Sequence, residues 1–157
     1  MIMRRTVVIG IGNPILGDDG VGIKAARELR DRLPEGSGID VIELSAGGIR
    51  LMDTMTGYER AVIIDAIVTG SGRPGEIFRL SPSDLLSTRN TVSTHDMDLP
   101  TALEMGRMLG IPLPSEVNIW GIEAQDIGTF GEELTRDVEN AVPKVVEEVM
   151  GSIGGRA

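Results

Sequence analysis

Three carboxylates and one imidazole are the candidate groups for hydrolytic or metal chemistry in this sequence. Asp18 and Asp19 follow an apolar run and a glycine-rich turn, and Asp65 interrupts a second apolar run. His95 is the only histidine, and cysteine is absent. The lack of cysteine excludes disulfides, thiolate nucleophiles and cysteine-based metal sites. Any catalysis by this chain therefore depends on carboxylates, hydroxyls and at most one imidazole.

The paired carboxylates Asp18 and Asp19 belong to a glycine-rich stretch that spans residues 10–22. Its glycines allow tight turns, and the N-terminus of a following helix favours negative charge. A carboxylate held there stays ionised, as a metal ligand must. The structural alternative is that Asp18 or Asp19 caps the helix, and for either residue alone this is the better interpretation. A phosphate cradle is disfavoured because two carboxylates occupy the anion position and no P-loop lysine follows.

Asp65 is the single charge within the apolar run 61–68. A charge in a central strand is costly unless it is paired or coordinated. An ion pair with Arg60 or Arg50 is as good an explanation as a functional role on these residues alone. A ligand role requires that Asp65 lie near the carboxyl end of its strand, where open α/β sheets bind ligands.

His95 precedes a predicted helix that Asp98 is expected to cap. The structural alternative is a solvated loop histidine. Histidine is also the commonest metal-binding side chain, and Asp96 is a candidate to orient its ring. One imidazole with two carboxylates would suit Zn²⁺, Ni²⁺ or Mn²⁺ and leave open positions for a substrate.

The elements that must position these residues alternate between strands and helices. Apolar and β-branched runs predict strands, and apolar residues at helical spacing predict helices. We expect strands at 6–11, 39–44, 61–68 and 116–122, and an edge strand or hairpin arm at 76–80. We expect helices at 19–33, 98–109 and 131–150, the last with a kink or interruption near Pro143, and a short helix that opens at 47–48. Residues 81–97 should form a loop with at most one helical turn.

This alternation predicts an α/β fold with three α/β/α layers around a mostly parallel, twisted central sheet, of the phosphorylase/hydrolase-like type. We expect one domain over residues 1–150 and a flexible C-terminal tail over 151–157. The apolar run behind the N-terminus is too short for a signal sequence or a membrane span, so the expected location is cytoplasmic, without membrane contact.

The charge balance excludes one large class of partner. Lysine plus arginine number 15 and aspartate plus glutamate 24, which gives a net charge of −9 and a pI near 4.6. A protein that tracks nucleic-acid phosphates needs a basic face, and base-stacking platforms need more aromatic residues than the 3% present here. We therefore expect no nucleic-acid partner.

Four short motifs occur in a fixed order along nearly the whole chain. Each is weak alone, but their combination is specific. They are Gly10-Ile11-Gly12-Asn13 with Asp18-Asp19-Gly20-Val21-Gly22, then Ile64-Asp65-Ala66, then Ser93-Thr94-His95 with Leu99-Pro100, and finally Gly121-Ile122-Glu123.

In these motifs the chain resembles the hydrogenase maturation endopeptidases, which trim the C-terminal extension from the large subunit of nickel–iron hydrogenases. The resemblance implies that the partner is a large-subunit precursor. It also implies that Asp19, Asp65 and His95 form the catalytic site and jointly bind the nickel that the precursor already carries. Zn²⁺ or another divalent ion would then be a substitute for Ni²⁺. The family's first ligand is more often glutamate, so Asp19 departs from the pattern.

With no cysteine and no Ser-His-base arrangement, we expect water to attack the scissile carbonyl, polarised by the metal as a Lewis acid. Asp18 or Asp19 could orient this water. Nickel that only positions the peptide is the alternative.

The protein is expected to be a monomer or a weak homo-oligomer.

Two other functions are compatible with parts of the sequence. A non-proteolytic metal-binding assembly factor would share the fold and bind the precursor or Ni²⁺ without cutting. A peptidyl-tRNA hydrolase also begins with a strand and the pattern of Gly10–Pro14. That enzyme needs a histidine soon after the motif and a basic face, whereas this chain has acids there and a charge of −9.

Overall fold

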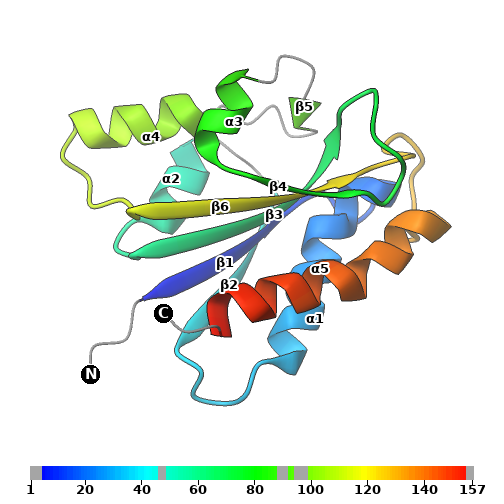
Figure 1. The fold of residues 1–157 in the computed structure, drawn as a ribbon, viewed down its shortest axis with the longest axis horizontal. Coiled ribbons are helices and arrows are strands. Elements are labelled where there is room, and N and C mark those ends of the chain that lie inside the picture. Colours follow the sequence, from blue (N-terminus) through cyan, green and yellow to red (C-terminus); the bar gives the residue numbers. More distant parts are fainter. Residues whose placement is uncertain (1–4, 46–48, 88–91, 94–98, 155–157) are drawn as a thin grey trace.

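A computed structural model describes residues 5–45, 49–87, 92–93 and 99–154 of the chain (Figure 1). Its centre is a six-stranded sheet in which five strands follow the order β2-β1-β3-β6-β4 and β5 pairs with β3. The strands are β1 (Thr6–Ile11), β2 (Ile39–Leu44), β3 (Arg60–Val68), β4 (Ile77–Leu80), β5 (Val92–Ser93) and β6 (Glu116–Glu123).

Strand directions confirm the predicted, mostly parallel sheet. β1 is parallel to β2 and β3, and β3 is parallel to β6. The edge strand β4 runs antiparallel to β6, and β5 runs antiparallel to the end of β3. Every residue of β1 is buried, as the continuous apolar run predicts for a strand covered on both faces.

Helices cover both faces of the sheet, which confirms the three predicted layers (Figure 1). One apolar cluster joins α1 and α5 to the even-numbered residues of β3, and a second joins α2 and α4 to its odd-numbered residues 61 and 63. The helices are the 3₁₀ helix η1 (Gly17–Gly20), α1 (Val21–Arg32), α2 (Ile49–Met55), α3 (Pro82–Ser87), α4 (Leu99–Met108) and α5 (Arg136–Gly154).

The closing helix differs from its predicted span. It starts at Arg136 and not at residue 131, and Pro143 lies inside it without interrupting it. It also continues through Gly154, so the part of the predicted tail at 151–154 is helical. The reason is tertiary contact: the Arg60 side chain bonds to the backbone and hydroxyl oxygens of Ser152, and Ile153 packs against the core. Residues 155–157 lie outside the described part of the chain.

The segment predicted as a loop with at most one helical turn contains two short elements. α3 has six residues, and the two-residue strand β5 pairs Val92 and Ser93 with Val68 and Ile67. β6 already pairs with β3 from Arg60 to Ile67, so β5 occupies the other edge, beyond the last pairing of β1 at Ile64. A two-residue strand has no periodicity that the sequence could reveal.

None of the helices in the described residues is long and apolar enough to cross a lipid bilayer.

Candidate active site

Glycines bring the first turn of α1 onto the sheet at the carboxyl ends of β1 and β3. A Cβ atom on Gly22 would clash with the carbonyl oxygens of Ile11 and Ile64, and one on Gly12 would clash with the carbonyl oxygen of Asp19. Glycine is therefore required here because backbone packs directly on backbone. This close approach places η1, which carries both acids of the pair, beside the ends of the two central strands.

Asp18 joins η1 to the loop that connects β6 to α5. It is fully buried, and its Oδ1 accepts a hydrogen bond from the Thr135 amide at 2.7 Å. Its Oδ2 accepts three more, from the amides of Gln125 and Asp126, both at 2.9 Å, and from the Thr135 hydroxyl at 2.8 Å. The structural alternative of a helix cap is wrong: Gly20 is the N-cap of α1, and no side chain caps either η1 or α1.

Asp19 points back to the loop that precedes η1. It is 4% exposed, and its Oδ2 accepts a hydrogen bond from the Asn13 amide at 3.1 Å. Gly17 opens η1 with φ 55°, a left-handed conformation that glycine adopts without strain, and a Cβ there would lie 2.7 Å from the Asp126 carbonyl oxygen. The backbone around Asp19 is thus fixed from both sides.

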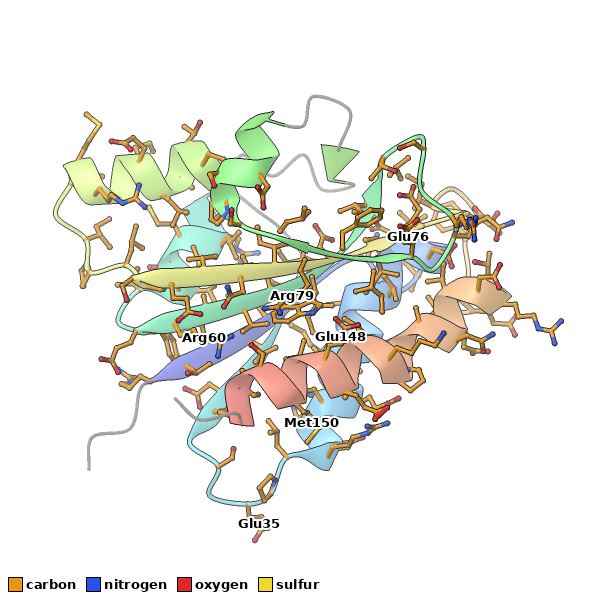
Figure 2. All side chains as sticks on the ribbon, in the orientation of Figure 1. Glu35, Arg60, Glu76, Arg79, Glu148 and Met150 are labelled. Atoms are coloured by element: carbon orange, nitrogen blue, oxygen red, sulfur yellow. The ribbon has the colours of Figure 1, made fainter. Side chains whose placement is uncertain are left out.

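Asp65 is 1% exposed and lies on β3 opposite Gly121 of β6. It belongs to the odd-numbered face of β3, with α2 and α4, whereas Arg60 points to the other face and bonds to Asn118 and Ser152 (Figure 2). Five residues of strand separate their Cα atoms by about 16 Å. The alternative of an ion pair with Arg60 is therefore wrong. The other candidate, Arg50, is an exposed residue of α2.

The structure brings Asp19 and Asp65 to the same end of neighbouring strands. Gly22, three residues after Asp19, lies against the carbonyl of Ile64, the residue before Asp65. Asp65 lies in the half of β3 that leads to its carboxyl end, with three residues of the strand after it. These two carboxylates are therefore placed where open α/β sheets bind ligands.

His95 and Asp96 lie outside the described residues. Ser93, two residues before His95 in the sequence, pairs with Ile67, two residues after Asp65. Within the described residues taken alone, no group of three or more histidine, cysteine, aspartate or glutamate side chains is arranged to hold a metal ion.

Glu123 is a buried carboxylate that sequence reasoning did not single out as a site residue. It ends β6, and it accepts hydrogen bonds from the Thr69 amide at 3.0 Å and the Thr69 hydroxyl at 2.6 Å. These bonds hold the loop after β3. An acid at the end of an apolar strand is the signal that could have found it, just as an acid within an apolar strand drew attention to Asp65.

A second feature missed by the sequence is a set of exposed apolar residues on the two loops beside η1, namely Ile15, Ile127 and Phe130, which we call the apolar rim. The backbone of Ile15 accepts a hydrogen bond from Gly131, which joins the loop after β1 to the loop after β6. In the second loop, the Asp126 carboxylate accepts hydrogen bonds from Thr129 and Gly128, which lower its pKa. This turn holds the loop that displays Ile127 and Phe130.

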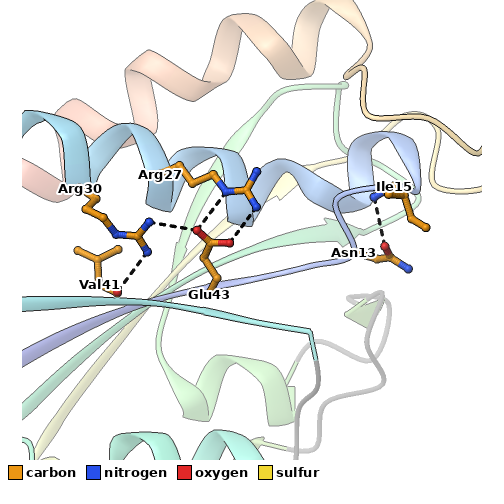
Figure 3. A network of polar contacts seen from close by, with 6 residues as sticks. All are labelled: Asn13, Ile15, Arg27, Arg30, Val41 and Glu43. Atoms are coloured by element: carbon orange, nitrogen blue, oxygen red, sulfur yellow. Dashed lines mark hydrogen bonds and ion pairs between the residues drawn. The ribbon is translucent and has the colours of Figure 1, made fainter.

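On the surface near the same end of the sheet, Glu43 of β2 accepts two hydrogen bonds from Arg27 and one from Arg30 (Figure 3). The bond from Arg27 is the main cause that lowers the pKa of Glu43, and Arg30 adds to it. Asn13 stabilises its own loop by accepting a hydrogen bond from the Ile15 amide at 3.2 Å. These contacts fix the position of α1 against β2 and the shape of the loop before η1.

Comparisons with known proteins give one consistent family. The HycI family model, described as hydrogenase maturation protease, matches residues 23–152. The hydrogenase 2 maturation protease of Escherichia coli K12 is 24% identical over 151 residues, which cover 95% of this chain and 90% of that protein.

Solved structures agree with the sequence comparison. The [NiFe] hydrogenase maturation protease HybD from Thermococcus kodakarensis superposes with a TM-score of 0.77 and 30% identity, covering 95% of this chain and 99% of that one. The hydrogenase maturating endopeptidase HybD from E. coli gives a TM-score of 0.81 with 25% identity, covering 96% and 92%. The similarity extends over nearly the whole chain in both cases.

Proposed function

We propose a function from the premise that the chain belongs to the hydrogenase maturation protease family. Membership implies that it processes a hydrogenase large subunit. The specific reaction we propose is removal of the C-terminal extension of a nickel–iron hydrogenase large-subunit precursor after nickel insertion. The nickel is carried by the substrate, and the protease recognises it there.

The observation that supports this proposal is the concentration of buried acid at one end of the sheet. Asp19 and Asp65 are buried at the ends of β1 and β3. Among the described residues, the only buried lysine or arginine is Arg60, at the opposite end of β3. Two carboxylates at the carboxyl end of a parallel sheet are donors suited to a divalent cation, and the substrate would bring that cation.

We assign the nickel ligands to Asp19, Asp65 and His95. Two carboxylates and one imidazole form a donor set that Ni²⁺ accepts, and Zn²⁺ fits it as a substitute. Asp19 keeps the charge of the glutamate that the family more often has at this position. The hydrogen bond from the Asn13 amide orients its carboxylate.

The reaction is hydrolysis of one peptide bond. A water oxygen bonds to the scissile carbonyl carbon, the C–N bond breaks, and a proton passes to the leaving amine. Asp19, Asp65 and His95 would hold the nickel, which would supply a Lewis acid for the carbonyl oxygen. Asp18 does not take the role of orienting the water, because donors from the segment that connects β6 to α5 already occupy both of its oxygens.

The apolar rim supports a protein substrate. Phe130 is 79% exposed and Ile15 is 50% exposed, on loops that hydrogen bonds hold next to η1. Rigid, exposed apolar residues beside a reaction centre are typical of protein-binding surfaces. We propose that the rim contacts the precursor near the scissile bond.

The test is incubation of the purified chain with nickel-loaded and nickel-free precursor, followed by mass spectrometry of the precursor C-terminus. We expect cleavage of the nickel-loaded form only. His95→Ala and Asp65→Asn should keep the circular dichroism spectrum of the folded protein and lose cleavage.

Three outcomes would contradict parts of the proposal. Equal cleavage of both precursors would rule out nickel recognition, and normal cleavage by both variants would refute the ligand assignment. Binding of the nickel-loaded precursor without cleavage would identify the chain as a non-proteolytic assembly factor on the same fold.

A further inference from the structure

We infer that Asp18 is a positioning residue, which sets the location of Asp19 by fastening the loop at 125–135 to η1. This inference rests on the proposed function, because it concerns the ligand role assigned to Asp19. We assign Asp18 no contact with the substrate or the metal.

The contacts of Asp18 reach across the chain. Its carboxylate accepts four hydrogen bonds from three residues, Gln125, Asp126 and Thr135, which are 107 to 117 positions away in the sequence. Its own amide donates to the Asp126 carbonyl at 2.8 Å. Side chain and backbone of Asp18 therefore bind the segment that connects β6 to α5.

The hydrogen bonds of Asp18 to residues 125–135, which we call the clamp, act on Asp19 because Asp18 and Asp19 are neighbours in a four-residue 3₁₀ helix. A shift or rotation of η1 would move the Asp19 carboxylate with it. On the other side, Gly12 packs against the Asp19 carbonyl and Asn13 donates to the Asp19 carboxylate. Asp19 is thus held between the loop before η1 and the loop that Asp18 anchors.

Thr135 offers a mild way to loosen this clamp. Its hydroxyl donates to Asp18 Oδ2, whereas its amide donates to Oδ1 and is unaffected by a change of side chain. Thr135→Val removes the hydroxyl with little change of shape, and Thr135→Ser retains it. Asp18→Asn is the stronger variant, since an amide group cannot accept all four hydrogen bonds.

The experiment measures kcat and KM for the nickel-loaded precursor, per folded protein and well below the melting temperature of each variant. We expect Asp18→Asn to lower kcat by about 10- to 100-fold, the range typical of residues that orient metal ligands. Thr135→Val should lower kcat by several-fold with KM unchanged, and Thr135→Ser should restore the wild-type kcat. A merely structural role would lower the melting temperature and leave kcat unchanged.

Asp19→Asn is the reference that separates the two hypotheses. If Asp19→Asn is inactive and Thr135→Val has wild-type kcat at a reduced melting temperature, the positioning role is overturned and the ligand assignment stands. If Asp19→Asn cleaves at the wild-type rate, the ligand assignment fails and the inference fails with it. If Asp18→Asn does not fold, the Thr135 pair alone decides.

Discussion

Arg60 and Asp65 are buried on the same strand, at opposite ends and on opposite faces of β3. At the amino end, the Arg60 guanidinium donates hydrogen bonds to Asn118 and Ser152 and lies 3.5 Å from the Glu116 carboxylate. At the carboxyl end, β1, β3 and β6 lead to the buried acids Asp18, Asp19, Asp65 and Glu123.

From this difference we infer that the amino end of β3 stabilises the fold and that the carboxyl end is the site of the proposed reaction. The Arg60 side chain connects β3 to β6 and to the last turn of α5, because Asn118 of β6 and Ser152 of α5 accept its hydrogen bonds. Asp18 and Glu123 likewise serve structure, because backbone amides and threonine hydroxyls satisfy them. Asp19 and Asp65 are also buried at the carboxyl end, and there we propose that they bind the substrate-borne nickel.

The largest expected effect tests the backbone packing at the carboxyl end. Gly22→Ala would drive a Cβ atom into the carbonyl oxygens of Ile11 and Ile64. We expect the free energy of unfolding to fall by about 3 kcal/mol or more, as for severe overpacking. Urea denaturation measures this loss.

Gly151→Ala is the matched control for that substitution. Gly151 lies in α5 with no atom within 4 Å of an added Cβ. Alanine there should stabilise the protein by about 0.5–1 kcal/mol. Equal effects of the two substitutions would contradict the close approach of α1 to the sheet.

The next effect tests the amino end. Arg60→Gln removes the bonds to Ser152 and shortens the reach to Asn118. We expect a loss of about 1–3 kcal/mol in unfolding free energy, because buried partners lose their hydrogen bonds. Circular dichroism melts and urea titrations measure it, and an unchanged stability would show that this cluster is not structural.

A smaller effect extends the comparison to the surface. Phe130→Ala removes an exposed side chain from the rim near the carboxyl end, and we expect KM for the precursor to rise about fivefold. Met108→Ala is the control, because Met108 is also exposed, at 78%, but ends α4 near the start of β6. Equal KM values for both variants would show that the rim is not part of the substrate-binding surface.

The smallest effect concerns the half-exposed contact of Glu43 with Arg27 and Arg30. Glu43→Gln should cost about 0.5 kcal/mol, because solvent screens such pairs. Arg27 lowers the pKa of Glu43, so its stabilisation is present above the ordinary glutamate pKa and is lost as the pH falls through the lower folded-state pKa. Urea titrations from pH 7 to pH 3 measure it. If the difference in unfolding free energy between wild type and Glu43→Gln grew on acidification, this direction of the pH dependence would be contradicted.

Much of the fold could be predicted from the sequence because buried parallel strands are continuous apolar runs. β1 and β2 have their predicted bounds, and the predicted layers are present. The misses depended on contacts between distant residues. The end of α5 is extended by Arg60, 92 residues away from Ser152, and β5 exists only through its pairing with β3.

The candidate site was predicted in part for the same reason. An acid in an apolar strand and an acid pair after a glycine-rich turn are local patterns, and the structure places Asp19 and Asp65 at one end of the sheet. The partners of Asp18 and Glu123 could not be predicted, because Thr135 and Thr69 reach them only after folding. The ligand roles of Asp19, Asp65 and His95 stay predictions.

The most direct test compares the two ends of β3 in one assay. The rate of cleavage of the nickel-loaded precursor is measured for wild type, Asp65→Asn and Arg60→Gln, per folded protein and below the melting temperature of each. We expect a loss of about 100-fold or more for Asp65→Asn, which exceeds the effect of changing residues around metal ligands, and a rate near wild type for Arg60→Gln. Wild-type cleavage by Asp65→Asn, or an equal loss in both variants, would contradict it.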